Sequence, residues 1–188
     1  MLAAENPFEH SDGDLVARFN CGDEQAFNLI VRRYQKRIFD LVFRFVRDFD
    51  ESSDIAQETF IRAHAKLKEF RGASALYTWL YRIAVNLSLN HMRKKKLRSF
   101  FSFDDPGVEE PIAEGGPEED LAAVQIRAQV GRAIEKLPPR QRSIFILRQY
   151  ERLTHKEIAA VLACSEGSIR AGYFHALKKL RAMLKECA

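Results

Sequence analysis

One segment of the chain, residues 99–119, breaks the helical pattern that the sequence keeps elsewhere. Residues 100–119 contain three prolines and three glycines, and eight acidic residues lie between Asp104 and Asp120 without a single lysine or arginine. Prolines and glycines at this density interrupt helices and strands alike, and no apolar period survives among them. We therefore predict an acidic linker at residues 99–119 that separates two independently folded bodies.

Apolar residues recur at helical spacing in the first body, residues 14–98, and no run alternates as a strand would. After an N-terminal tail of residues 1–13, the spacing and caps predict helices at Asp14–Asn20, from Asp23 to about Arg47, from about Ser53 to Glu69, and from Ser74 to Lys96. The expected core side chains of the long second helix are Ala26, Phe27, Ile30, Tyr34, Ile38, Leu41, Val42 and Phe45. In the last of these helices the expected apolar stripe is Leu76, Leu80, Ile83 and Leu87. This body is predicted to be a helical bundle.

The second body, residues 120–188, also reads as helices. Apolar spacing from Leu121 to Leu137 predicts one helix, which Pro138 stops. Pro139 suits the first turn of the next, which reaches about Tyr150. Thr154 and Glu157 form a capping box that opens a short helix to Leu162, and Ser165 can cap a last helix over Glu166–Glu186. The fold class expected for the whole chain is therefore all-α, with two helical domains.

The last two helices of the second body have the spacing of a helix-turn-helix motif, with a tight turn at Ala163–Ser165. The second helix of such a motif enters the DNA major groove, where its exposed side chains contact bases and flanking cations hold phosphates. Candidate contacts within residues 154–178 are Ser168, Arg170, Ala171, Tyr173, Phe174, His175 and Lys178. A plain helical hairpin with a solvated basic face is the alternative, and DNA binding is favoured over it.

A polar stripe follows one side of the last helix of the first body. Its members are Trp79, Arg82, Asn86, Asn90 and Arg93, and Lys94 begins a run of further cations with no acid among them. Rings can stack on unpaired bases, amides can hydrogen-bond base edges, and cations can follow the backbone of a single strand. A lone tryptophan is more often a core residue, but two asparagines on one helix face add little stability. The stripe therefore predicts contact with single-stranded DNA.

An acidic and amide cluster lies on the third predicted helix. Asp54, Gln57 and Glu58 are three and four residues apart, so they project from one side of the helix. A metal site is disfavoured because no fourth ligand follows at helical spacing. A solvated face and a docking surface for a basic protein partner both remain open from the pattern alone.

Several function classes find no support in the sequence. It has no phosphate-cradling glycine loop, no nucleophile elbow and no histidine cluster, so we expect no catalytic residue, metal, cofactor or small-molecule substrate, and no enzyme. No stretch approaches a membrane span and the N-terminus lacks an apolar signal core, which predicts a cytoplasmic protein. The formal net charge of +4 favours polyanionic partners.

The motifs together name a family. Residues 22–38 (GDEQAFNLIVRRYQKRI), 54–60 (DIAQETF), 70–86 (FRGASALYTWLYRIAVN) and 153–170 (LTHKEIAAVLACSEGSIR) resemble, in this order, the extracytoplasmic-function (ECF, group IV) sigma factors of bacterial RNA polymerase, and most of all their sigma-E envelope-stress branch. The resemblance implies a sigma-2 domain at 14–98 that binds polymerase and melts the −10 element, and a sigma-4 domain at 120–188 that reads the −35 element. It also implies transcription initiation at stress-type promoters under an anti-sigma factor, often membrane-anchored, that could hold the protein at the inner membrane face.

The resemblance assigns roles to the candidate residues. Asp54, Gln57 and Glu58 match the patch that docks on the β′ clamp helices of core polymerase, while the β flap is the partner expected for the sigma-4 domain. Asn86 matches the position that lines a pocket for a flipped −10 base, and the loop that closes this pocket corresponds to Phe70, Arg71, Gly72, Ala73 and Ser74. The alternative that remains is a stand-alone helix-turn-helix regulator whose N-terminal bundle binds a ligand or dimerises.

Three residues of the helix-turn-helix depart from the family pattern. The family usually has Arg where Gly172 stands, often Arg where His175 stands, and often Gly where Ala163 stands. Glycine inside a helix is expected to cost about 1 kcal/mol relative to alanine. These departures leave the −35 preference open.

Overall fold

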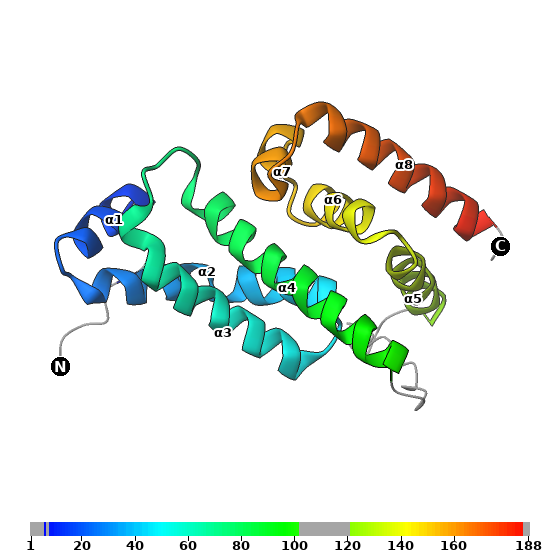
Figure 1. Ribbon diagram of the computed structural model, residues 1–188, viewed down its shortest axis with the longest axis horizontal. Helices are drawn as coiled ribbons and strands as arrows, with labels where there is room; N and C mark the ends of the chain where they lie inside the picture. The colour runs from blue at the N-terminus through cyan, green and yellow to red at the C-terminus, as the bar shows by residue number, and fades with distance from the viewer. Residues whose placement is uncertain (1–5, 7, 102–120, 186–188) are drawn as a thin grey trace. The chain divides into compact units, whose positions relative to one another are not determined.

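The computed structural model describes residue 6, residues 8–101 and residues 121–185 of the 188-residue chain (Figure 1). It divides into two compact units, Met1–Arg93 and Lys94–Ala188. Helices and no strands are found among the described residues, which confirms the predicted all-α fold class. The predicted linker lies outside the described residues except for its first three, residues 99–101, which are helical. The domain limits 14–98 and 120–188 stay predictions.

The first unit contains α1 (Asp12–Asn20), α2 (Glu24–Val46), α3 (Phe49–Lys66), a 3-10 turn η1 (Leu67–Glu69) and most of α4 (Leu76–Phe101). Helix α1 begins two residues before the predicted start because Ser11, and not a later residue, is its cap: Asp14 N donates to Ser11 Oγ at 3.1 Å. Asp23 caps α2 as predicted, accepting from Gln25 N at 3.0 Å. Helix α2 packs against both α1 and α3.

Helix α3 begins at Phe49, four residues before the predicted start near Ser53, so that prediction was wrong. The segment DFDESS read as a polar break, yet it is the capped first turn: Glu51 N donates to Asp48 Oδ1 at 2.7 Å. Acidic residues in a first turn are favoured by the partial positive charge of the helix N-terminus. Polarity here marked a helix start and not a loop.

The core of the first unit follows the predicted pattern on α2 and departs from it on α4. All eight predicted α2 side chains are buried, as are Ile55 and Phe60 of α3. On α4, Ile83 and Leu87 are only half-buried, whereas the fully buried positions after Leu80 are Tyr81, Ala84, Val85 and Ser88. The buried face therefore includes small residues, which permit a close helix approach that a search for large apolar side chains does not detect.

Side chains of α2 and α3 contact the described part of α4. The guanidinium of Arg37 on α2 lies 6.0 Å from the ring centre of Tyr81. His91 Nε2 lies 3.0 Å from Glu51 Oε2 on α3. With one face of α4 packed in this way, its opposite face is left exposed. Helix α4 extends five residues beyond its predicted end at Lys96, since neither proline nor glycine follows before Pro106.

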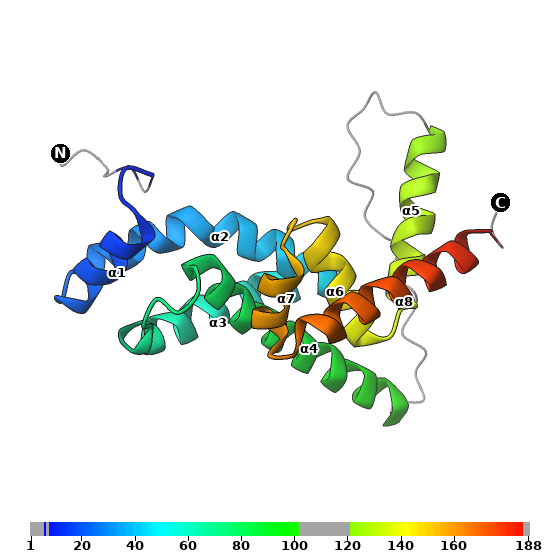
Figure 2. The ribbon, with the colours of Figure 1, turned by 90° about the horizontal axis from the view of Figure 1, so that it is seen from above.

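The second unit contains α5 (Leu121–Glu135), α6 (Pro139–Gln149), α7 (His155–Leu162) and α8 (Glu166–Lys185), and α8 packs against each of the other three (Figures 1 and 2). The predicted capping box is present: Glu157 N donates to Thr154 Oγ1 at 3.2 Å and Thr154 N to Glu157 Oε2 at 2.7 Å. Pro139 opens α6 as predicted. The core includes Ile134, Ile144 and Ile169, whereas Ile126 of α5 is exposed.

Across the described ranges, no helix is long and apolar enough to cross a lipid bilayer.

Candidate nucleic-acid and partner-binding surfaces

The turn between α7 and α8 is short because its first residue adopts a left-handed backbone. Ala163 has φ +50°, and Cys164 N donates back to Ala159 O at 3.0 Å, which ends α7. Ser165, the residue before α8, then caps that helix: its hydroxyl accepts from Ser168 N at 3.3 Å. Ile158 of α7 and Ile169 of α8 are fully buried, and the two helices pack against each other. Glycine adopts this backbone without steric cost, which is the physical reason for glycine to be common at this position.

The predicted DNA-contacting residues of α8 fall into two groups. Arg170, Ala171, Phe174, His175 and Lys178 are exposed on the side of α8 opposite its buried face, and Arg170 Nη2 lies 2.7 Å from Glu166 Oε1. Ser168 and Tyr173 are half-buried.

Both residues of the half-buried group contact other helices of the unit. The Tyr173 hydroxyl accepts a hydrogen bond from Gln149 of α6, and its ring centre is 6.0 Å from that of His155 of α7. Tyr173 therefore helps to hold α8 in place. The hydroxyl of Ser168 accepts a hydrogen bond from Arg140 Nη2 at 3.0 Å. Arg140, an exposed residue of α6, thus lies beside the start of α8, and no local sequence signal joins residues 28 positions apart.

Gly172 lies where α8 meets α6. A Cβ atom placed on Gly172 would lie 2.5 Å from Cδ1 of Ile144, a side chain with no exposed surface. The glycine therefore permits a close approach of the two helices, and a larger residue would require the buried Ile144 side chain to move. From the sequence alone, the low helix propensity of glycine is the only effect that can be predicted for Gly172.

The polar stripe of α4 is present on the exposed side of that helix. Arg82, Asn86, Asn90 and Arg93 are exposed, as is Lys94, and Arg93 Nη1 donates to Asn90 Oδ1 at 3.3 Å. Trp79 is half-buried. The stripe offers amides and guanidinium groups to a ligand on a face that no core residue occupies.

The loop of residues 70–75 joins η1 to α4 and meets the start of this stripe. The ring centres of Phe70 and Trp79 are 5.4 Å apart. Gly72 has φ +69°, a left-handed backbone that turns the chain back toward α4. Arg71, Gly72 and Ala73 are exposed, while Ser74 is half-buried. The structure thus brings the predicted loop and the predicted helix stripe together through one aromatic contact.

The predicted docking cluster lies on the surface of α3. Asp54 and Gln57 are exposed, and Glu58 is partly exposed and accepts from Arg62 Nε at 2.7 Å. No group of three His, Cys, Asp or Glu side chains in the described part of the chain is arranged to hold a metal ion.

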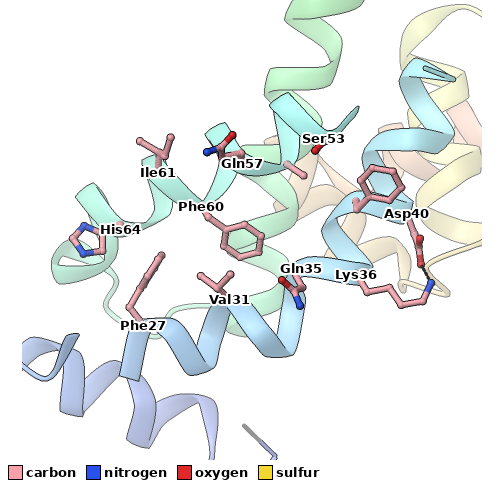
Figure 3. A pocket seen from close by; sticks show the side chains of 12 residues that line it. Phe27, Val31, Gln35, Lys36, Asp40, Ser53, Gln57, Phe60, Ile61 and His64 are labelled. Carbon is pink, nitrogen blue, oxygen red and sulfur yellow. Dashed lines mark hydrogen bonds and ion pairs between the residues drawn. The ribbon is translucent and has the colours of Figure 1, made fainter. Parts of the chain in front are cut away.

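A groove runs beside this cluster, between α2 and α3, and sequence reasoning missed it. Its volume is about 880 Å³, and Figure 3 shows Gln57 on its α3 side. Its lining residues are Phe27, Val31, Gln35, Lys36, Phe39, Asp40, Ser53, Ala56, Gln57, Phe60, Ile61 and His64. The available sequence signal was Ile61, an apolar residue that lies off the core stripe of α3. In the structure Ile61 is 57% exposed, and an exposed apolar side chain indicates a surface that a partner can cover.

Two family models match the chain: "Sigma-70 region 2" over residues 30–98 and "Sigma-70, region 4" over residues 127–180. The RNA polymerase sigma-H factor of Pseudomonas aeruginosa is 38% identical over 95% of this chain and 98% of that protein. The ECF RNA polymerase sigma-E factor of Escherichia coli K12 is 40% identical over 88% of this chain and 90% of that protein. The chain belongs to the ECF class of sigma factors. It is a transcription initiation factor and not an enzyme.

Solved structures show the same fold. CnrH, in complex with the cytosolic domain of CnrY, superposes with a TM-score of 0.68 at 24% identity, covering 94% of this chain and 99% of that one. The sigma factor RpoE of Bartonella quintana, in complex with the anti-sigma factor NepR, gives a TM-score of 0.66 at 24% identity, covering 85% and 96%. In the present chain, the region 2 match contains the α3 cluster and the α4 stripe, and the region 4 match contains the helix-turn-helix.

Proposed function

We propose that this sigma factor binds core RNA polymerase and directs it to promoters through two DNA-reading helices, α4 for the −10 element and α8 for the −35 element. The observation that carries the proposal is the division of α4 into two faces. Leu80, Ala84 and Ser88 are fully buried, while Arg82, Asn86 and Asn90 are exposed. Amides and guanidinium groups on an exposed helix face suit the edges and backbone of unpaired DNA.

At the −10 element, Asn86 hydrogen-bonds the edge of a base flipped out of the non-template strand. The loop of Phe70, Arg71, Gly72, Ala73 and Ser74 closes over that base, and Trp79, against which Phe70 rests, forms the apolar side of the site. Extruding a base costs a few kcal/mol, and its capture offsets that cost and so favours the melted promoter. Arg82, Asn90, Arg93 and Lys94 hold the strand.

At the −35 element, the exposed group of α8 enters the major groove: Arg170, Ala171, Phe174, His175 and Lys178. Ser168 and Tyr173 act at the margin of this contact. Tyr173 fixes α8 on α6 through Gln149, and Ser168 brings the cation of Arg140 to the start of α8. A guanidinium at that place suits a DNA phosphate.

Docking on the polymerase uses Asp54, Gln57 and Glu58 together with the neighbouring groove. Acidic groups beside an apolar groove between two helices fit an amphipathic partner helix that carries basic residues, which is the chemistry expected of the β′ clamp helices. Lys36 and Asp40, an ion pair of 2.9 Å within the lining, make one part of the groove polar. The β flap is the partner of the second unit.

Control by an anti-sigma factor fits the same surfaces. A solved relative of this fold is held in complex with the anti-sigma factor NepR, and CnrH is held by the cytosolic domain of CnrY. An inhibitor that covers the α2–α3 groove would prevent polymerase binding. If that inhibitor is membrane-anchored, it retains this cytoplasmic sigma factor at the inner membrane face until a signal releases it.

The test is promoter-specific transcription. Purified chain is added to core RNA polymerase on a template library, and transcripts with defined start sites are expected from a subset of templates. A stand-alone helix-turn-helix regulator would give none unless another sigma factor were present, and that result would reject the proposal. Core polymerase without the chain is the control.

A further inference from the structure

Phe174 is an apolar side chain without an apolar environment. It is 64% exposed, and its ring makes a T-shaped contact with its neighbour His175, with centres 5.7 Å apart. The core of the second unit is closed by Ile169, Ala176 and Leu180 on the other face of α8. Phe174 therefore contributes nothing to that core, and its exposed ring suggests a ligand.

The position of Phe174 on α8 narrows the kind of ligand. It lies one helical turn after Arg170 and one turn before Lys178, so the three share one exposed stripe. Ala171, also exposed, is three residues before Phe174 on the same side. The result is a small apolar island, Ala171 and Phe174, between two cations.

The chemistry of the major groove offers one match to such an island. Base edges there present hydrogen-bond donors and acceptors, which a phenyl ring cannot use, and the thymine 5-methyl group, which it can contact. Phosphates are no partner for a phenyl ring either, and the flanking Arg170 and Lys178 suit them better.

The geometry points to a specificity role: Phe174 reads a thymine of the upstream promoter element by packing against its 5-methyl group, while Arg170 and Lys178 hold the backbone or neighbouring base edges. This inference rests on the proposed function of α8 and adds the chemical class of the base that it recognises. It also assigns the selection of that base to shape and apolar contact instead of to hydrogen bonds.

The test replaces thymine by uracil, which pairs with adenine in the same way but lacks the methyl group. The full chain, bound to core RNA polymerase, first selects upstream sequences from a pool of random duplexes. Each thymine of the enriched upstream element is then changed singly to uracil, and binding is measured by competition. At one position uracil is expected to weaken binding by about fourfold, the effect of withdrawing one methyl group from an apolar contact.

The variant Phe174→Ala should remove this discrimination. It is expected to bind thymine-containing duplex roughly tenfold more weakly than the original chain does, and to bind the thymine and uracil duplexes equally. Because the ring is exposed, the variant keeps its fold. Ile126→Ala is the matched control, since Ile126 is an apolar residue of the same unit that is 59% exposed on α5, and it should retain full discrimination.

The outcomes separate this inference from the proposed function. If the original chain selects a defined upstream element but binds every uracil duplex as well as the thymine duplex, the thymine role of Phe174 is rejected and promoter recognition stands. The same rejection follows if Phe174→Ala keeps the discrimination, because another residue then reads the methyl group. If no sequence is enriched at all, the proposed function itself fails.

Discussion

At the scale of single residues, exposure separates side chains that bind from side chains that pack. Asn86 and Ser88 are two residues apart on α4, yet Asn86 is exposed, whereas Ser88 is fully buried and donates to Ala84 O at 2.8 Å. Replacing an exposed side chain removes an interaction with a ligand and little else. Residues such as Asn86 can therefore be tested without unfolding the protein.

Asn86→Ala is expected to reduce selectivity for the −10 element while binding to core polymerase is unchanged. Loss of a base-edge contact costs about 1–3 kcal/mol of discrimination, which corresponds to roughly 5-fold to 150-fold between matched and mismatched −10 sequences. Run-off transcription on such templates measures it, with competition for core polymerase measured in parallel. Asn28→Ala, which removes an exposed asparagine of α2, is the control. Equal loss of selectivity and core binding in Asn86→Ala would reject a base-reading role.

Asp23 gives a pH-dependent contribution to stability. The hydrogen bond from Arg18, 2.8 Å long, is the main reason that the pKa of the Asp23 carboxyl lies below its ordinary value of 3.8. A lowered carboxyl pKa stabilises the folded state at pH values above the carboxyl's ordinary pKa. This stabilisation is lost as the pH falls through the pKa of the folded state. Asp23→Asn keeps a good helix cap without the charge. The difference in unfolding free energy between the two proteins should be constant from pH 7 to about pH 5 and shrink below pH 4; a difference independent of pH would contradict the assignment.

At the scale of elements, two of the three departures of the helix-turn-helix from the family pattern, Ala163 and Gly172, have opposite effects on the backbone and its packing. Ala163 occupies a left-handed position that favours glycine, so it is a strained residue. Gly172 lies where α8 crosses α6 closely, so the absence of a side chain there suits the packing of the two helices. Each makes a prediction about stability.

Ala163→Gly is expected to stabilise the second unit by about 0.5–1 kcal/mol. The left-handed backbone costs alanine about 1–2 kcal/mol, and the extra freedom of glycine in the unfolded chain cancels part of the gain. Thermal unfolding measures the change. In the control Ala160→Gly, within α7, the same exchange should instead destabilise by about 1 kcal/mol. A lower melting temperature for Ala163→Gly would show that Ala163 is not strained.

Gly172→Ala is expected to destabilise the protein despite the better helix propensity of alanine, because the new methyl group would overlap Cδ1 of Ile144. Ile144→Val removes that carbon atom. In the Ile144→Val background, Gly172→Ala should become stabilising by up to about 1 kcal/mol. A double-mutant cycle by chemical denaturation measures the coupling. Strictly additive effects would mean that the two residues do not compete for space.

At the scale of the whole molecule, the proposed polymerase-docking surface and the two proposed DNA-reading helices belong to one chain. The proposed docking cluster lies on α3 and the proposed −10 stripe on α4, so different residues would carry the two tasks. Binding to polymerase and reading of DNA should therefore be separable by substitution.

Asp54→Arg is expected to weaken binding to core polymerase by roughly tenfold or more, since a reversed charge repels a basic partner. Asp54 is exposed, so the melting temperature should be unchanged. Competition against the unaltered chain for core polymerase measures the effect. Glu69→Arg, the reversal of another exposed acid of the first unit, is the control and should bind normally. An affinity equal to that of the control would remove Asp54 from the docking surface.

The sequence by itself determined the features that depend only on residues close together in the chain. The buried stripe of α2, the Asp23 cap and the Thr154–Glu157 capping box follow from spacings within a few turns of one helix, and the family's motif blocks identify the class. Only the tertiary structure decided the contacts between helices: the small-residue face of α4, the α2–α3 groove, and the pairs Gly172–Ile144 and Arg140–Ser168. The physical reason is that periodicity gives the face that a helix buries, but not which residue of another helix lies against it.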